Sequence, residues 1–105
     1  MSQFDEKDRS LEAQLANDED MLFRILARRN RLLGEWAAEL MGLSDVEANA
    51  YSTDVVRADF EGGGGKDVTL KLLGDLTAAG VEIDENRIRE ATKEKLVEAR
   101  RQLIG

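Results

Sequence analysis

The chain has 105 residues and a formal net charge of −7, and it contains no cysteine, histidine or proline. One domain with a modest core is expected at this length. The missing residue types exclude disulfides, thiolate metal ligands and histidine-activated nucleophiles, and the acidic balance excludes nucleic acid as the general partner. Because Ala, Leu, Glu, Arg and Lys are abundant, we expect an all-α domain.

Residues 1–19 are expected to form a mobile N-terminal segment. Residues 1–20 carry seven acidic side chains against two basic ones, and their apolar content is thin. Such a segment buries too little surface to offset its loss of conformational entropy. If it became helical, however, one apolar edge would run into the next helix through Phe4, Leu11, Leu15 and Leu22. A frayed tail and a segment that folds on inserting into a partner both fit this pattern.

Residues 19–41 are predicted to form the longest helix. Asn17 to Asp20 suit its start, and Gly42 suits its end. Arg29 interrupts the apolar stripe and needs a partner or a route to water. The stripe consists of the apolar residues Leu22, Ile25, Leu26, Leu33, Trp36 and Leu40.

Residues 45–60 are predicted to form the second helix, which starts at a capping box of Ser44 and Glu47. This helix is apolar on two sides. One side contains Arg57 among Val46, Ala50, Thr53, Val56 and Phe60, and the other contains Ala48, Tyr51, Val55 and Ala58. Two apolar sides indicate that the helix is covered by other helices on both sides in a bundle, or that one of its faces binds another protein.

Glycines 62–65 predict a flexible connection between helices. The glycine run is followed by Lys66, but a helix rather than a strand precedes it and Asp67 replaces the hydroxyl residue of a phosphate-binding loop. We therefore exclude a phosphate loop.

Residues 68–79 and 85–103 are predicted to form the last two helices. Asp67 and Asp84 suit their starts, and Gly80 suits the turn between them. With short connections between antiparallel neighbours, residues 20–105 are expected to form a four-helix bundle.

Catalysis has little support. The hydroxyl residues have no histidine to activate them, and the acidic residues match no calcium loop. We therefore expect no catalytic residues, no metal site, no required cofactor and no enzymatic activity.

Arginines concentrate in the first helix, where residues 21–35 have a local net charge of +3. Arg24, Arg28 and Arg31 are expected on its solvent side, with Glu35 as an ion-pair partner of Arg31. A salt-bridged surface explains this cluster, and so does a surface for an acidic partner or a phosphate group.

Arg29 and Arg57 each interrupt an apolar face, so they are stronger candidates for a binding site than the arginines on the solvent side. A buried guanidinium needs an internal acid or an anionic ligand. Asp54 and Asp59 are candidate internal partners. The alternative hypothesis is that both arginines face one pocket that binds the phosphates of a nucleotide.

Four blocks of the sequence resemble the ζ-subunit family of α-proteobacterial F-type ATP synthases, whose members are small inhibitors of ATP hydrolysis. The blocks are FDEKDRSLEAQLANDED, RRNRLLGEWAAELMGL, VVRADFE and AAGVEIDENRIREA. The resemblance implies that the N-terminal segment is inhibitory, with partner contacts at Phe4, Arg9, Leu11, Leu15 and Leu22. It also implies that ADP or ATP is a regulatory ligand, which directs attention to Arg29 and Arg57.

On this resemblance we expect a regulator that docks on the alpha, beta and gamma subunits of the catalytic head and inserts its N-terminal segment at a catalytic subunit interface. The alternative is a nucleotide-responsive adaptor or protein-interaction module with another partner, which would use the apolar face of Tyr51 and Val55. Under either interpretation, the candidate partner surface consists of Arg24, Arg28, Arg31, Tyr51 and Val55. No signal peptide or membrane-spanning run occurs. We therefore expect a monomeric cytoplasmic protein, held at the cytoplasmic side of the inner membrane by the ATP synthase.

Overall fold

The computed structural model describes residues 19–62 and 65–105, with the side chains of residues 65–67 excluded. These residues form four α-helices: α2 (Glu19–Met41), α3 (Asp45–Gly62), α4 (Gly65–Ala78) and α5 (Glu85–Ile104). The prediction of an all-α fold of four packed helices is confirmed. The predicted mobile segment falls on residues that the structure does not describe, apart from Glu19, the first residue of α2.

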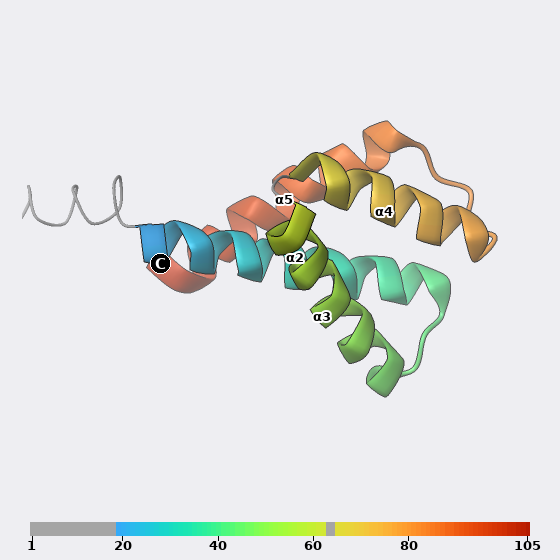
Figure 1. Cartoon of the computed structure of the whole chain (residues 1–105), viewed down its shortest axis with the longest axis horizontal. Coiled ribbons are helices and arrows are strands. Elements are labelled where there is room, and N and C mark those ends of the chain that lie inside the picture. The colour runs from blue at the N-terminus through green and yellow to red at the C-terminus, as the bar shows by residue number, and fades with distance from the viewer. Residues whose placement is uncertain (1–18, 63–64) are drawn as a thin grey trace, which may run out of the picture.

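Helix α2 is central, because its contacts with α3 and with α5 are the most extensive between any two of the described helices. Helix α5 runs back along α2, so the C-terminus lies beside the start of α2 (Figure 1). The N-terminal end of α2 and the C-terminal end of α5 project together beyond α3 and α4 (Figure 1). These two helix ends are defined here as the arm.

The hydrophobic core lies where all four helices meet. Helix α4 supplies three of its buried residues, spaced four apart along one face of the helix. The buried cluster is Leu33 and Ala37 from α2, Val55 from α3, Val68, Leu72 and Leu76 from α4, and Ile88 and Ala91 from α5.

The turn between α2 and α3 has the predicted local structure. Gly42 adopts a positive φ of 71°, and the Leu43 amide donates to the Ala38 carbonyl at 3.0 Å, which is the hydrogen bond of a glycine C-cap. The Glu47 amide donates to the Ser44 hydroxyl at 3.2 Å, and the Ser44 amide donates to the Glu47 carboxylate at 2.9 Å. The predicted capping box is confirmed, and the hydrogen bond from the Ser44 amide to the Glu47 carboxylate lowers the pKa of Glu47 below its ordinary value.

The turn between α4 and α5 has the same two features, a glycine C-cap and a side-chain N-cap. Gly80 has a φ of 83°, and the Val81 amide donates to the Leu76 carbonyl at 2.9 Å. The Asp84 carboxylate then accepts from the Arg87 amide at 2.8 Å and caps α5. Both sharp reversals therefore depend on a glycine followed by an acceptor side chain.

The glycine run shortens the helices less than expected. Helix α3 continues to Gly62 and α4 already begins at Gly65. Position 67 therefore lies inside α4, so the prediction of an N-cap at Asp67 is wrong. Glycine is unfavourable mainly in helix interiors, and helix ends tolerate it.

The buried face of α2 also differs from the predicted apolar stripe. Only Ile25 and Leu33 of that stripe are buried, whereas Leu22 and Leu40 are 54% and 43% exposed. The remaining buried positions of α2 are small or polar: Asn30, Gly34, Ala37 and Ala38. Small side chains are required here because α3 crosses α2 closely: a Cβ atom added to Gly34 would stand 2.7 Å from the Ser52 Cα. Leu22 belongs to the first turn of α2, at the end of the helix away from this crossing.

Candidate functional site

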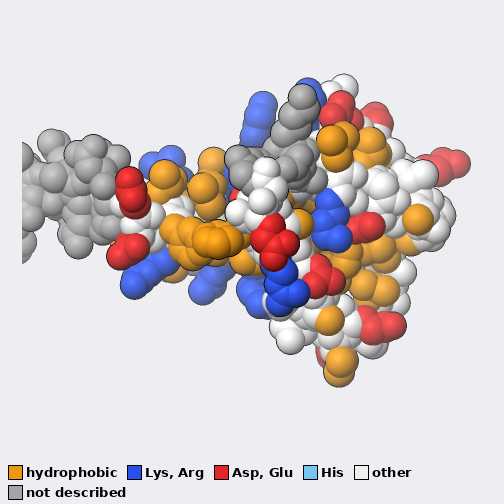
Figure 2. All heavy atoms as spheres, viewed as in Figure 1, with side chains coloured by type: hydrophobic (Ala, Val, Ile, Leu, Met, Phe, Trp, Pro, Cys, Tyr) orange, Lys and Arg blue, Asp and Glu red, His pale blue; other side chains and the backbone are white. Residues whose placement is uncertain are grey.

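A groove lies between the first half of α2 and the second half of α3. Its cavity is about 540 Å³, which is within the usual size of small-molecule pockets. We call it the α2–α3 groove and define it by its lining residues, which are Phe23, Leu26, Ala27, Arg29, Asn30, Thr53, Val56, Arg57, Asp59 and Phe60. Figure 2 shows hydrophobic side chains gathered on this face beside Lys and Arg side chains.

Two aromatic rings form one wall of the α2–α3 groove. The rings of Phe23 and Phe60 meet edge to face at 84°, with centroids 5.1 Å apart. This is a favourable aromatic geometry, yet Phe23 remains 49% exposed and Phe60 68% exposed. The groove therefore presents an aromatic surface to solvent.

A buried polar cluster forms the opposite side of the groove. Asn30, which is 1% exposed, donates to the Asp59 carboxylate at 2.7 Å and accepts from the Arg29 guanidinium at 3.0 and 3.1 Å. Arg29 and Asp59 also approach within 3.6 Å. Burial lowers the pKa of Arg29, and the Asp59 charge partly opposes that effect. Of the two predicted internal acids, Asp59 is thus the partner of Arg29.

Arg57 lines the same groove, so the structure brings Arg29 and Arg57 to one cavity. The prediction that Arg57 interrupts a buried face is wrong, because its side chain is 62% exposed. Its guanidinium lies 3.9 Å from Asp54 on the same helix. An exposed ion pair of this kind contributes little to stability, so Arg57 can readily turn toward a ligand.

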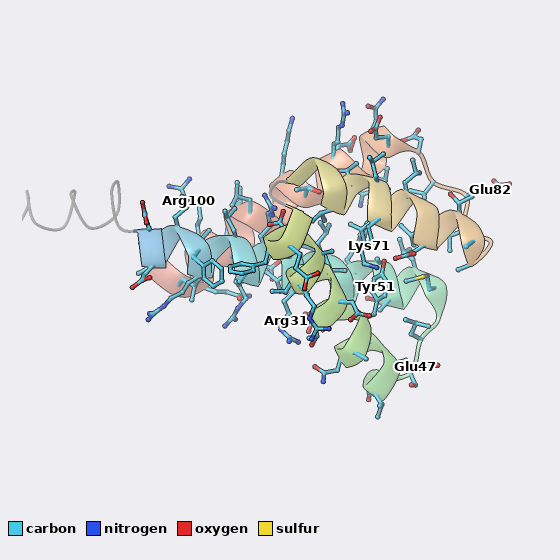
Figure 3. The ribbon with its side chains drawn as sticks, viewed as in Figure 1. Arg31, Glu47, Tyr51, Lys71, Glu82 and Arg100 are labelled. Carbon is cyan, nitrogen blue, oxygen red and sulfur yellow. The ribbon has the colours of Figure 1, made fainter. Side chains whose placement is uncertain are left out.

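Arg24, Arg28 and Arg31 lie along the neighbouring surface of α2. Arg28 donates to Gln102 of α5 at 2.9 Å. Arg31 donates to Asn49 at 3.1 Å and to Thr53 at 3.2 Å (Figure 3). The predicted ion pair between Arg31 and Glu35 does not form, because Arg31 instead reaches across to α3.

Tyr51 and Val55 do not form a free surface, so their assignment to a partner surface is wrong. Val55 is fully buried, and the Tyr51 hydroxyl donates to the Asp75 carboxylate of α4 at 2.7 Å. Lys71 donates to the same carboxylate at 3.1 Å and lies over the Tyr51 ring (Figure 3). Burial and the bond to Asp75 raise the pKa of Tyr51 well above its ordinary value.

The apolar face of α3 that is exposed lies on the side of the helix opposite Tyr51 and Val55. Val46 is 81% exposed, and Phe60 lies on the same side. Helix α4 packs against Tyr51 and Val55 and leaves this side open. The adaptor hypothesis thereby loses the free face on which it depended.

Only one of the five predicted inhibitory residues lies within the described part of the chain. Leu22 is exposed on the arm. Phe4, Arg9, Leu11 and Leu15 lie outside the described residues.

The residues that shape the groove most, which are Phe23, Asn30 and Phe60, were not predicted as functional. Asn30 carried a usable signal, because it lies four residues after Leu26 and three before Leu33, on a stripe where a polar side chain needs a partner. Phe23 and Phe60 carried no signal of their own, because their meeting depends on how α2 and α3 cross.

Within residues 19–62 and 65–105, no group of acidic side chains is arranged to hold a metal ion. None of the described helices is long and apolar enough to cross a membrane.

Comparisons with known proteins identify the family. The family model described as ATPase inhibitor subunit zeta matches residues 1–102. A protein structure solved by solution NMR is 44% identical and superposes with a TM-score of 0.70, covering 80% of this chain and 95% of the other. No curated protein matches significantly. The resemblance inferred from the sequence blocks is thus confirmed, and the chain belongs to the ATPase inhibitor subunit zeta family, whose members are regulators of the F-type ATPase rather than enzymes.

Proposed function

We propose that the chain inhibits ATP hydrolysis by inserting residues 1–19 at a catalytic subunit interface of the F-type ATP synthase head. The observation that carries this proposal is the family match, which includes the N-terminal segment. Leu11 and Leu15, with Phe4 one further repeat away, supply a narrow apolar edge for the cleft. The inserted segment would block the closure of the catalytic interface that hydrolysis requires.

The helical body would serve as the anchor. Among the described residues, its core draws on all four helices, from Ile25 to Ala99, so we expect the body to fold without residues 1–18. Binding energy gained at the head would offset the entropy lost when the segment becomes ordered. In this proposal the alpha, beta and gamma subunits are the partners, and the chain acts on the cytoplasmic side of the inner membrane.

The test is ATP hydrolysis by the isolated catalytic head in the presence of the full chain or of a chain that begins at Glu19. The full chain is expected to inhibit, whereas the shortened chain is expected to fold with the same helical circular dichroism and not to inhibit. Equal inhibition by both chains would reject insertion of the segment.

Point variants refine the test without shortening the chain. Leu11→Asp and Leu15→Asp would each place a charge on the apolar edge and are expected to weaken inhibition. Leu70→Asp is the matched control, because Leu70 is 52% exposed on α4. A loss of inhibition in the control alone would instead assign the partner contact to α4.

An adenine nucleotide is a second proposed ligand, because Arg29 and Arg57 line one cavity together with aromatic side chains. A base would stack on an exposed ring, and Arg57 would pair with phosphate. Chemical-shift perturbation with ADP is expected at Arg57 and Phe60. An absence of change near Arg29 and Arg57 would reject this ligand.

A further inference from the structure

We infer that the α2–α3 groove is a docking surface for residues 1–18 of the same chain. The docked segment would be unavailable to the ATPase head, so the groove would set how much of the protein is ready to inhibit. This regulatory consequence depends on the function proposed above. The docking itself does not.

The surface is larger than the α2–α3 groove alone. An adjoining hollow of about 360 Å³ shares Phe23, Ala27, Thr53 and Val56 with it and extends to Leu103 of α5. Its other lining residues are Arg24, Arg28 and Arg31. The two hollows therefore form one continuous apolar floor with arginines at its edges.

The edge of this surface carries unbalanced positive charge. Among the described residues, no salt bridge joins Arg24, Arg28 or Arg31 to an acidic side chain. The hydrogen bonds of Arg28 and Arg31 go to the neutral groups of Gln102, Asn49 and Thr53. An occupant with acidic side chains beside apolar ones would complement this edge, because arginine pairs strongly with carboxylate.

Residues 1–18 have that chemistry. They carry five acidic and two basic side chains, a net charge of −3, and Leu11 and Leu15 are spaced to lie on one helical face. Glu12 adjoins Leu11 in the sequence, so a carboxylate would lie beside the apolar edge.

The chain connection also permits docking. The segment joins α2 at Glu19, one turn before Phe23. Asn17 and Asp18 are residues that favour tight turns, and helical hairpins use loops of about 2–5 residues. A reversal there would bring Leu15 toward Phe23. A helix over the remaining residues 1–16 would be about 24 Å long, which is longer than the stretch of α2 from Phe23 to Arg31 that lines the floor, about 12 Å.

The docked and undocked forms would be in equilibrium, and the catalytic head would bind only the undocked form. A ligand shifts such an equilibrium by its preference for one form. Salt would favour undocking, since it screens the attraction between arginines and carboxylates.

The chain has no cysteine, so one substitution supplies a unique site for a spin label. The full chain with Ser10→Cys, labelled with a nitroxide and ¹⁵N, is expected to lose amide signal intensity at Val56 and Phe60 of α3. Intensity at Gly80 and Val81, in the turn between α4 and α5, is expected to remain. Added salt should restore the lost signals.

The matched control separates docking from simple tethering. The same labelled chain with Leu11→Asp and Leu15→Asp keeps the tether and is expected to regain signal at Val56 and Phe60, whereas Leu70→Asp is expected to change nothing. Equal signal loss in the Leu11 and Leu15 variant would overturn the inference, as would an absence of loss in the parent.

A mixed sample tests for a second copy. Spin-labelled chain without ¹⁵N, added to ¹⁵N chain without cysteine, is expected to leave every signal intact. Signal loss in this sample would overturn the inference in favour of docking between two copies.

The regulatory consequence has its own readout. Phe60→Glu leaves residues 1–18 unchanged and is expected to release them, so less protein should give half-maximal inhibition of the head. An unchanged half-maximal concentration, with docking lost in the spin-label experiment, would reject the regulatory role. Inhibition lost on removing residues 1–18 tests the proposed function separately.

Discussion

Gly34 of α2 lies directly against Ser52 of α3. A Cβ atom added to Gly34 would stand 2.7 Å from the Ser52 Cα and 3.2 Å from the Ser52 hydroxyl oxygen. That hydroxyl donates to the Ala48 carbonyl at 2.8 Å, so the Ser52 side chain is satisfied within its own helix. The crossing of the two helices at this point lets α3 diverge from α2 toward Phe60, and the α2–α3 groove lies in that divergence.

Gly34→Ala is expected to destabilise the protein. Because the added Cβ would stand 2.7 Å from backbone, the cost is expected in the upper part of the overpacking range, about 2–3 kcal/mol. This exceeds the gain of about 1 kcal/mol from replacing a helical glycine by alanine. The free energy of unfolding in urea is expected to fall by about 1 kcal/mol or more. An unchanged or higher value would show that α2 and α3 can separate at no cost.

Gly74→Ala is expected to stabilise the protein. Gly74 is exposed inside α4, and an added Cβ would meet no atom within 4 Å. The gain is about 0.5–1 kcal/mol, because alanine loses less backbone entropy in a helix. It should appear as a higher urea midpoint with an unchanged slope. A loss of stability would contradict the open surroundings of this position.

Asp59→Ala is expected to be costly. It leaves the buried Asn30 amide without its acceptor and Arg29 without its nearest carboxylate. Removing one partner of a buried charged pair costs about 3–5 kcal/mol, and we expect about 2–4 kcal/mol here, because both side chains keep some contact with solvent. Urea unfolding measures the loss.

Asp54→Ala is the matched control for Asp59→Ala. Its ion pair with Arg57 is exposed on both sides, so the change should stay within about 0.5 kcal/mol. Equal losses for the two variants would show that the Asn30 cluster adds nothing beyond surface charge.

Tyr51→Phe is expected to lower stability at neutral pH by about 1.5–3 kcal/mol, which is typical of a hydrogen bond to a charged group. The raised pKa of Tyr51 means that the folded protein keeps the hydroxyl proton at a pH at which the unfolded chain releases it. The contribution of Tyr51 is thus complete below the unfolded pKa of about 10 and is lost as pH rises above it. The stability gap between parent and variant should narrow above pH of about 10. A constant gap in urea unfolding across this range would contradict the assignment.

Local signals in the sequence predicted the helix ends well. The capping box of Ser44 and Glu47, the glycine turns at Gly42 and Gly80 and the cap at Asp84 are all formed. Each depends on hydrogen bonds between residues a few positions apart, so its geometry follows from the residue types present.

Periodicity could not decide which side of α3 is buried. Both sides of this helix are apolar, and the core takes the side of Val55 and leaves Val46 in solvent. Likewise, Arg31 had Glu35 within reach on its own helix, but it bonds to Asn49 and Thr53 across the helix crossing. Neither choice is expressed in the spacing of residues along one helix.

By itself, the sequence determined an all-α protein, the places where its helices stop and start, an acidic leader ahead of α2, and membership in a family of ATPase inhibitors. Only the tertiary structure decided that Asn30 pairs with Asp59, twenty-nine residues away, and that Phe23 and Phe60 form an open groove between α2 and α3. Caps and turns are selected by hydrogen bonds within a few residues, whereas the groove depends on a helix crossing that the close contact of Gly34 with Ser52 makes possible.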